Sequence, residues 1–217
     1  MAEHPILFSG EMVQAILNGR KTQTRRVITE RWQMCRSPED EPEWFVEICP
    51  YGKPGDRLWV RETFQIVQPW GAADGEWIGD DIMEIDGRLG HDKPESFPYW
   101  WQAVYKADGD WGVWWRPSIF MPRWASRITL EIASIRVEKV QEISYQDILA
   151  EGFHPDPPGE PIVISTPGIT VDGRITVVEM WHEILRGRFA VNWNKLNAKR
   201  GYSWQSNPWV WVLEFKL

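Results

Sequence analysis

Cysteine and histidine are scarce in this chain of 217 residues, which has two cysteines and four histidines. Cys35 and Cys49 alone cannot form a disulfide scaffold, and a structural zinc site needs more ligands than these residues readily supply. We therefore predict two reduced thiols, no bound metal and no cofactor.

Long apolar runs are also missing from the sequence. No stretch approaches the roughly 20 apolar residues that a helix needs to cross a bilayer. The N-terminus, Met1-Ala2-Glu3-His4, is acidic or neutral and does not have the pattern of a signal peptide. We expect a cytoplasmic protein that makes no contact with a membrane; the sequence does not indicate its oligomeric state.

Positive charge is in deficit, with 24 Lys and Arg against 31 Asp and Glu and a net charge of −7. This balance argues against simple electrostatic binding of nucleic acid. The acidic surplus is local, however, because 15 of the acidic residues but only 5 of the basic ones lie between Ser37 and Trp100. The basic residues concentrate in 20–36, 116–136 and 186–200, so we expect a locally basic surface on an acidic protein.

Tryptophan, in contrast, is abundant, with 16 in the chain. A tryptophan side chain anchors cores and interfaces, and it also offers a flat surface on which a nucleic-acid base can stack. We expect most of these residues to lie in the core. Trp115 and Trp124 are close in sequence to arginines, so they are the candidates for stacking beside phosphate contacts.

The N-terminal segment has the clearest local pattern. An apolar strand over 5–9 leads to Ser9, a helix N-cap, and an apolar stripe at helical spacing ends at Gly19. Residues 21–26 then read as an extended strand without an apolar face, which is typical of a wall lining a ligand site. Its two faces carry Thr22, Thr24 and Arg26 on one side, and Lys21, Gln23 and Arg25 on the other.

The rest of the chain alternates between periodic and irregular stretches. Strands are predicted over 58–64, 101–106, 125–140 and 209–215, and helices over 145–151, 177–185 and 189–198. Periodicity is lost at about 29–54, 65–100 and 154–173, which we interpret as insertions. These elements predict one α+β domain over 1–217: a small β-barrel with short flanking helices and long loop insertions.

Four motifs resemble the ASCH-domain family, and more narrowly the ASCH proteins of phages and prophages. The first is Ile16-Leu17-Asn18-Gly19-Arg20-Lys21-Thr22-Gln23-Thr24-Arg25-Arg26. The others follow in order: Gly55-Asp56-Arg57-Leu58-Trp59-Val60, the helix end Ala150-Glu151-Gly152, and the last strand over 209–215. Together they cover about half the chain, and the resemblance implies a PUA-like barrel that binds RNA, a single-stranded nucleic acid or a modified nucleoside.

The resemblance also implies a chemistry. Some family members hydrolyse the amide of N4-acylated cytidines with a lysine, a threonine three residues later, and a glutamate from the downstream helix. Lys21, Thr24 and Glu151 match these positions. Amide hydrolysis needs a nucleophile, a base and stabilisation of an oxyanion. Thr24 supplies a hydroxyl and a desolvated Lys21 a base, while Glu151 either positions Lys21 or shuttles a proton to the leaving amine.

Alternatives to this amidohydrolase remain at the level of sequence. The alternatives are a non-catalytic nucleic-acid-binding module, a nuclease suggested only by analogy with the family, and a phage protein that binds a host protein. In the binding interpretations, the ligand contacts are drawn from the basic and aromatic residues near the motifs: Arg20, Thr22, Arg25, Arg26, Arg61, Trp115, Arg116, Arg123 and Trp124.

Overall fold

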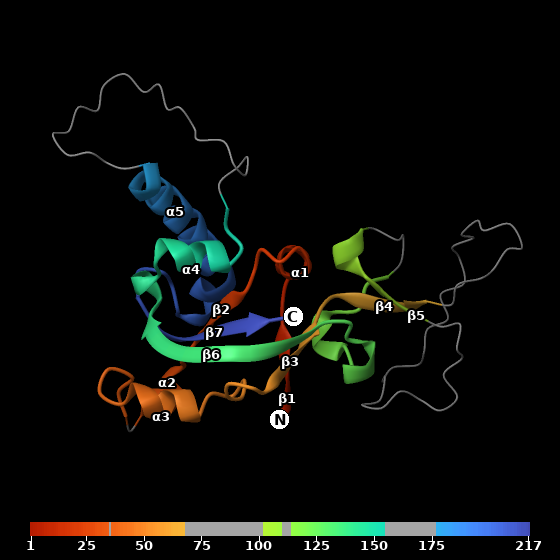
Figure 1. Cartoon of the computed structure of the whole chain (residues 1–217), viewed down its shortest axis with the longest axis horizontal. Helices are drawn as coiled ribbons and strands as arrows, with labels where there is room; N and C mark the ends of the chain where they lie inside the picture. The colour runs from red at the N-terminus through yellow and green to blue at the C-terminus, as the bar shows by residue number, and fades with distance from the viewer. Residues whose placement is uncertain (35, 68–101, 110–113, 155–176) are drawn as a thin grey trace, which may run out of the picture. The chain divides into compact units, whose positions relative to one another are not determined.

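The computed structural model of the chain describes residues 1–34, 36–67, 102–109, 114–154 and 177–217 (Figure 1). It has mixed α and β structure, as expected from the sequence, and the chain divides into two compact units. The first comprises Met1–Gly19, Cys49–Ser134 and Phe215–Leu217, and the second comprises Arg20–Ile48 and Ile135–Glu214.

The first unit is built on three paired strands. β1 (Glu3–Leu7) runs parallel to β3 (Arg57–Arg61), and β3 pairs antiparallel with the start of β6 (Thr129–Lys139). A separate two-stranded sheet joins β4 (Phe64–Val67) to β5 (Gln102–Tyr105). Helix α1 (Gly10–Leu17) begins at Ser9, whose hydroxyl accepts a hydrogen bond from the Met12 amide, and it ends at Asn18.

The second unit contains the polar strand β2 (Gln23–Val27), which pairs antiparallel with β7 (Trp209–Lys216). Its helices are α2 (Glu30–Gln33), α3 (Pro42–Glu47), α4 (Tyr145–Ala150) and α5 (Val177–Asn197). Short 3₁₀ segments also occur in the chain, at Lys106–Asp108, Ser118–Phe120, Arg123–Ala125, Val140–Glu142 and Ala198–Arg200.

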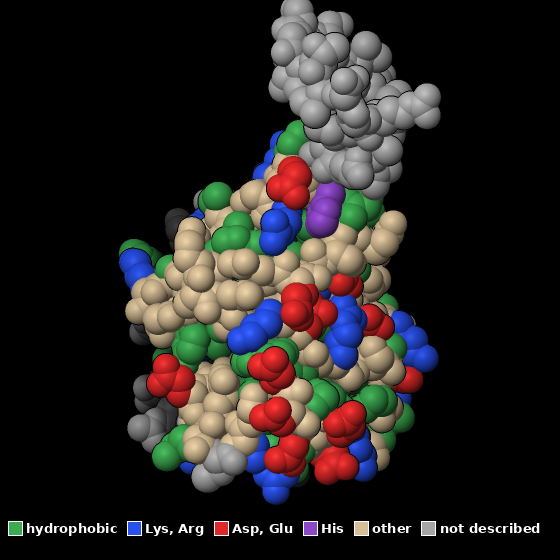
Figure 2. Space-filling view, turned by 90° about the vertical axis from the view of Figure 1, so that its left-hand side faces the viewer, with side chains coloured by type: hydrophobic (Ala, Val, Ile, Leu, Met, Phe, Trp, Pro, Cys, Tyr) green, Lys and Arg blue, Asp and Glu red, His purple; other side chains and the backbone are tan. Residues whose placement is uncertain are grey.

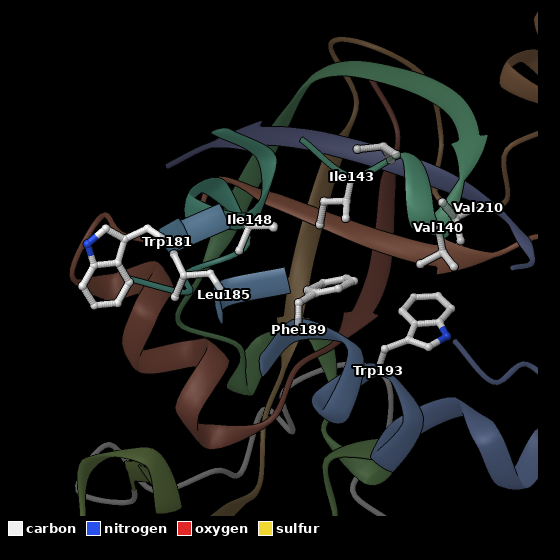
Figure 3. Close-up of a cluster of buried hydrophobic side chains, with 9 residues drawn as sticks. Val140, Ile143, Ile148, Trp181, Leu185, Phe189, Trp193 and Val210 are labelled. Atoms are coloured by element: carbon white, nitrogen blue, oxygen red, sulfur yellow. The ribbon is translucent and has the colours of Figure 1, made fainter. Parts of the chain in front are cut away.

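One face of α5 makes the apolar core of the second unit (Figure 3). Four α5 side chains at helical spacing are buried: Trp181, Leu185, Phe189 and Trp193. They pack with Ile148 of α4, with Val140 and Ile143 at the end of β6, and with Val210 and Val212 of β7. This core fixes α4 beside the β2–β7 pair, which positions the candidate site described below.

The predicted small barrel is not found in the described residues. The strand order is β1-β3-β6-β7-β2, so β1 and β2 are end strands. The strand predicted over 58–64 is interrupted at Glu62, whose carboxylate binds Arg127 at 2.9 Å, and Phe64 begins the separate β4–β5 sheet. One predicted strand thus contributes to two sheets, and the ladder stays open.

Two further expectations need correction. The stretch 29–54, expected to be irregular, contains α2 and α3, and Phe45 of α3 is fully buried, while its interpretation as an insertion stays a prediction. The two helices predicted on either side of Gly187 are one continuous helix, α5. The other two predicted insertions fall mainly outside the described residues. None of the helices found in the described ranges combines the length and apolarity needed to cross a membrane.

Candidate functional site

Glu151 stands at the end of α4, which the sequence caps at both termini. The Ser144 hydroxyl accepts a hydrogen bond from the Asp147 amide, and the Asp147 carboxylate accepts one from the Ser144 amide. Reciprocal bonds of this kind satisfy two donors at a helix N-terminus. The helix ends at Gly152, whose φ of 95° favours glycine, and Glu151 is the C-cap residue.

Lys21 reaches this helix end from the start of β2. Gly19 turns the chain with a φ of 68°, and the Thr22 amide donates to the Ala150 carbonyl at 2.8 Å. The Lys21 ammonium then lies 2.6 Å from Glu151 Oε2 and 3.1 Å from the Glu151 carbonyl oxygen. Its side chain is 0% exposed. The structure therefore places two of the three residues that matched the family chemistry in direct contact.

Arg25, on the same face of β2, binds the other oxygen of that carboxylate. Its Nη1 is 3.2 Å from Glu151 Oε1, and its Nη2 is 2.6 Å from Glu138 Oε1 and 3.2 Å from Asp147 Oδ2. The Gln23 side-chain oxygen accepts a further bond from Arg25 at 2.7 Å. A buried guanidinium thus holds three carboxylates drawn from β6 and α4.

Arg136 completes the cluster from β6. It binds Glu138 at 3.1 Å, Asp147 at 2.7 Å and Glu214 at 2.6 Å. Its side chain is 36% exposed, whereas that of Arg25 is 1% exposed. Arg136 therefore forms the solvent-facing edge of a charged network whose interior consists of Arg25, Lys21 and Glu151.

Burial and neighbouring charges both shift the pKa values of Lys21 and Asp147. Burial lowers the pKa of Lys21, Glu151 opposes this, Arg26 and Arg25 reinforce it, and the pKa ends below its usual value. Burial works to raise the pKa of Asp147, but hydrogen bonds from Gln23 and Ser144 and the charges of Arg25 and Arg136 hold it well below its usual range. Burial thus works against the charged form of Lys21, whereas its hydrogen-bond donors and the two arginines favour the ionised form of Asp147.

Thr24, the third residue matched to the family chemistry, is 4% exposed. In the β2–β7 register it pairs with Leu213, whereas Arg25 pairs with Val212. Neighbouring positions along a strand face opposite ways. The Thr24 hydroxyl is therefore on the opposite face of β2 from Arg25.

Arg20, Thr22 and Arg26 surround this pair in sequence but differ in exposure. Arg20 and Thr22 are exposed, and Arg26 is partly buried. The Arg20 carbonyl lies 3.5 Å from His154 Nε2. Arg20 and Thr22 are thus the motif residues that a ligand from solvent meets first, whereas Arg25 contacts a phosphate only if it releases its carboxylates.

The other expected ligand residues lie in the first unit. Arg61 stacks on Trp59, with 4.9 Å from its guanidinium carbon to the ring centroid, and donates to the Met121 carbonyl. Arg116 donates to the Gln65 side chain. Arg123 binds Glu3 at 2.7 Å. Trp115 and Trp124 are partly buried.

Sequence reasoning missed two features. Glu138, Asp147 and Arg136 were read as strand and cap residues, and no spacing signal connects them with Arg25, which lies 113 positions from Glu138. The exposed tryptophan of the 114–124 segment is Trp114, at 85%, rather than Trp115. The run Trp114-Trp115-Arg116 signals an aromatic and basic surface but does not say which ring is outside.

Acidic and basic side chains are intermixed on the face drawn in Figure 2. On that face, the described basic residues do not form the single-sign surface that the sequence had suggested. Within the described ranges, no group of three or more His, Cys, Asp or Glu side chains is arranged to hold a metal ion.

Comparison with known proteins gives a structural likeness. The chain is similar to the ASCH domain from Lactobacillus crispatus JV V101, with a TM-score of 0.37 and 11% identity, over 99% of this chain and 79% of that chain. No family model and no curated protein matches the chain. The solved structure carries the family name that the motifs resemble, but at this TM-score and identity the likeness adds nothing about the chemistry of the site.

Proposed function

We propose that this protein hydrolyses the amide of an N4-acylated cytidine-type nucleoside, with Lys21, Thr24 and Glu151 as the catalytic residues. The observation that carries the proposal is the buried contact of 2.6 Å between the Lys21 amine and Glu151 Oε2. A fully buried lysine is expensive to keep charged, and such groups with displaced pKa values concentrate at functional sites.

The chemistry follows from the lowered pKa of Lys21. A neutral Lys21 amine removes the proton of the Thr24 hydroxyl, whose oxygen attacks the acyl carbon. The carbon–nitrogen bond then breaks, and the resulting lysine ammonium returns its proton to the departing N4 of cytosine. Water hydrolyses the acyl-threonine, with Lys21 again as base, and releases the carboxylic acid. Glu151 orients the amine through both steps.

The alternative interpretation is that Lys21 and Glu151 form an ion pair whose role is purely structural. The two interpretations predict different effects of a Lys21 substitution on turnover. We expect purified protein to release free carboxylate and cytidine from N4-acetylcytidine, and Lys21→Met to reduce kcat/KM by about 10³-fold or more. The same substitution at the exposed Lys195, Lys195→Met, should leave kcat/KM unchanged.

Thr24 is tested separately, because its hydroxyl lies on the opposite face of β2 from Arg25. Thr24→Ser keeps a hydroxyl and should retain turnover, whereas Thr24→Val should abolish it. If Thr24→Val stays active while Lys21→Met is inactive, water is the nucleophile and Thr24 has no catalytic role. A wild-type protein that releases no carboxylate from a panel of N4-acylated cytidines would overturn the enzyme assignment.

One observation favours a second function, the binding of a single-stranded nucleic acid without turnover. Trp114 is 85% exposed and lies two residues before Arg116, and an exposed indole beside an arginine is suited to base stacking next to a phosphate contact. The test of this second function is a measurement of RNA affinity as a function of salt concentration.

A further inference from the structure

We propose that Arg25 is a positioning residue for the proposed hydrolysis: its guanidinium holds Glu151 Oε1 so that Oε2 faces the Lys21 amine. The proposal rests on the function given above. It adds a residue that acts through Glu151 and touches no substrate.

The geometry at Glu151 divides one carboxylate between two nitrogen donors. Oε2 lies 2.6 Å from Lys21 Nζ, and Oε1 lies 3.2 Å from Arg25 Nη1. A carboxylate at a helix C-terminus meets an unfavourable dipole and has rotational freedom about its own side chain. Because each oxygen of Glu151 has its own nitrogen donor, the orientation of the carboxylate toward Lys21 is fixed.

The position of Arg25 itself is fixed from every side. Glu138 of β6 accepts from its Nε at 3.0 Å and its Nη2 at 2.6 Å, and the Gln23 side chain of β2 accepts from Nη1 at 2.7 Å. Asp147 of α4 lies 3.2 Å from Nη2, and the Phe189 ring of α5 lies 6.0 Å from the guanidinium carbon. A planar fork of donors satisfies several acceptors in this way, whereas a lysine ammonium is a single point charge.

Arg136 is the natural comparison, because it carries the same charge in the same network. It binds the outer carboxylates Glu138, Asp147 and Glu214. Replacing it removes one positive charge and disturbs the same ion pairs, but it leaves the Arg25–Glu151 contact in place. A purely structural role of the network therefore predicts similar effects at both arginines.

The electrostatic consequence has a definite sign. Burial is the largest cause of the lowered pKa of Lys21, and the positive charge of Arg25 adds to it. Replacing Arg25 by a neutral residue removes this repulsion and leaves the carboxylates in place, so the pKa of Lys21 rises. Since the neutral amine is the base, the acidic limb of the pH–activity profile moves to higher pH.

The experiment compares full-length wild type, Arg25→Gln, Arg25→Lys and Arg136→Gln. The pH profile of kcat/KM is measured with N4-acetylcytidine. The titration of Lys21 is followed without substrate, by NMR of protein labelled with ¹³C and ¹⁵N at lysine, with Lys21→Met to assign the signal. Circular dichroism establishes that each variant is folded.

We expect Arg25→Gln to move both the Lys21 titration and the acidic limb to higher pH, and to lower kcat by about 10²-fold through misplacement of Glu151. Arg25→Lys keeps the positive charge, so the acidic limb of the pH profile should stay at its wild-type position. Its kcat should remain low, because a lysine lacks the planar set of donors of a guanidinium group. Arg136→Gln should have the smaller effect on both measurements.

A folded Arg25→Gln with an unmoved Lys21 titration overturns the proposal, and so does an Arg25→Lys variant with the wild-type kcat. If Arg25→Gln does not fold, Arg25→Lys decides alone through its kcat. A third outcome is that the wild type shows no turnover, while the Lys21 pKa still differs between the wild type and Arg25→Gln. The proposed function then fails, and the electrostatic coupling of Arg25 to Lys21 is supported.

Discussion

Asp147 has two roles at the scale of a single residue. Its carboxylate caps the N-terminus of α4 by accepting from Ser144, and it also binds Arg25 and Arg136 in the charged network. Hydrogen bonds to an ionised carboxylate stabilise a fold more than those to a neutral group, by about 1.5–3 kcal/mol each. The residue therefore links the geometry of α4 to the arginines that surround the proposed site.

The linked pKa of Asp147 gives a prediction for stability against pH. Its folded-state pKa lies below its ordinary value of 3.8, so its contribution is present above that pH and is lost as pH falls below it. We expect Asp147→Asn to lower the free energy of unfolding at pH 7 by about 2 kcal/mol. Urea unfolding between pH 7 and pH 2 should show a weaker loss of stability in the variant than in wild type.

The control for this prediction is the same substitution at Asp40, which is exposed. Asp40→Asn should follow the wild-type curve. Equal pH dependence in Asp147→Asn and wild type would mean that Asp147 does not contribute through its charge.

Prediction of single residues from the sequence succeeded for contacts between residues close in sequence and failed for contacts between distant residues. Alternation placed Lys21, Gln23 and Arg25 on one face, and all three join the network. The acids that receive them are 113 to 191 positions away, and only the packing of α4, β6 and β7 selects them. The resemblance identified Glu151 because it carried a long-range relation that spacing does not contain.

At the scale of an element, α3 shows how a short helix is held in place. Pro42 occupies its start, where proline is favoured because its missing amide has no partner to lose. Phe45 is fully buried, and its carbonyl accepts from the Trp211 indole at 2.6 Å. One side chain and one backbone acceptor thus attach the helix to β7.

We predict that Phe45→Ala destabilises the protein by about 3–5 kcal/mol, the range for removing a buried phenylalanine. Urea unfolding followed by tryptophan fluorescence measures the change, since Trp211 lies in the affected contact. Glu47→Ala changes an exposed residue of the same helix and should shift the free energy of unfolding by less than about 0.5 kcal/mol. Similar losses in both variants would contradict the anchoring role of Phe45.

The elements that sequence predicted well are those with caps or clean alternation. Ser9 and Gly19 delimit α1, Ser144 and Gly152 delimit α4, and alternating burial marks β6 through Leu130 and Ile132. The helix α3 escaped prediction because its stretch is short and rich in proline and glutamate, which reads as a loop. The break after β3 escaped because it depends on Arg127, more than 60 residues from Glu62.

At the scale of the whole molecule, a net charge of −7 makes any nucleic-acid binding depend on local groups. Arg61 donates to the Met121 carbonyl oxygen, which is a neutral acceptor. Arg123, in contrast, is paired with the carboxylate of Glu3. A phosphate competes more easily with a neutral acceptor than with a carboxylate.

We expect wild-type protein to bind labelled single-stranded RNA at low salt, with log Kd linear in log salt. Arg61→Gln combined with Arg116→Gln should flatten the slope by about 1.4, at 0.7 per phosphate contact. Trp114→Ala should weaken binding by about 1–3 kcal/mol without changing the slope, because stacking releases no counterions. Fluorescence anisotropy measures both quantities.

Lys53→Gln provides the matched charge change at an exposed position that lies in none of the three basic stretches. It should leave the slope within error of wild type. An identical slope in the Arg61/Arg116 double variant, or no binding by wild type at low salt, would remove polymer binding from the functions of this protein.

The path of the chain between the two units has a consequence for gene architecture. The backbone passes from one unit to the other four times, after Gly19, Ile48, Ser134 and Glu214. Neither unit is encoded by one continuous stretch of codons, so no single cut in the gene yields an intact half. A frameshift before codon 215 changes residues of the first unit, although most of that unit is encoded upstream. Both units are therefore encoded together, and a single recombination event cannot replace one unit while leaving the other intact.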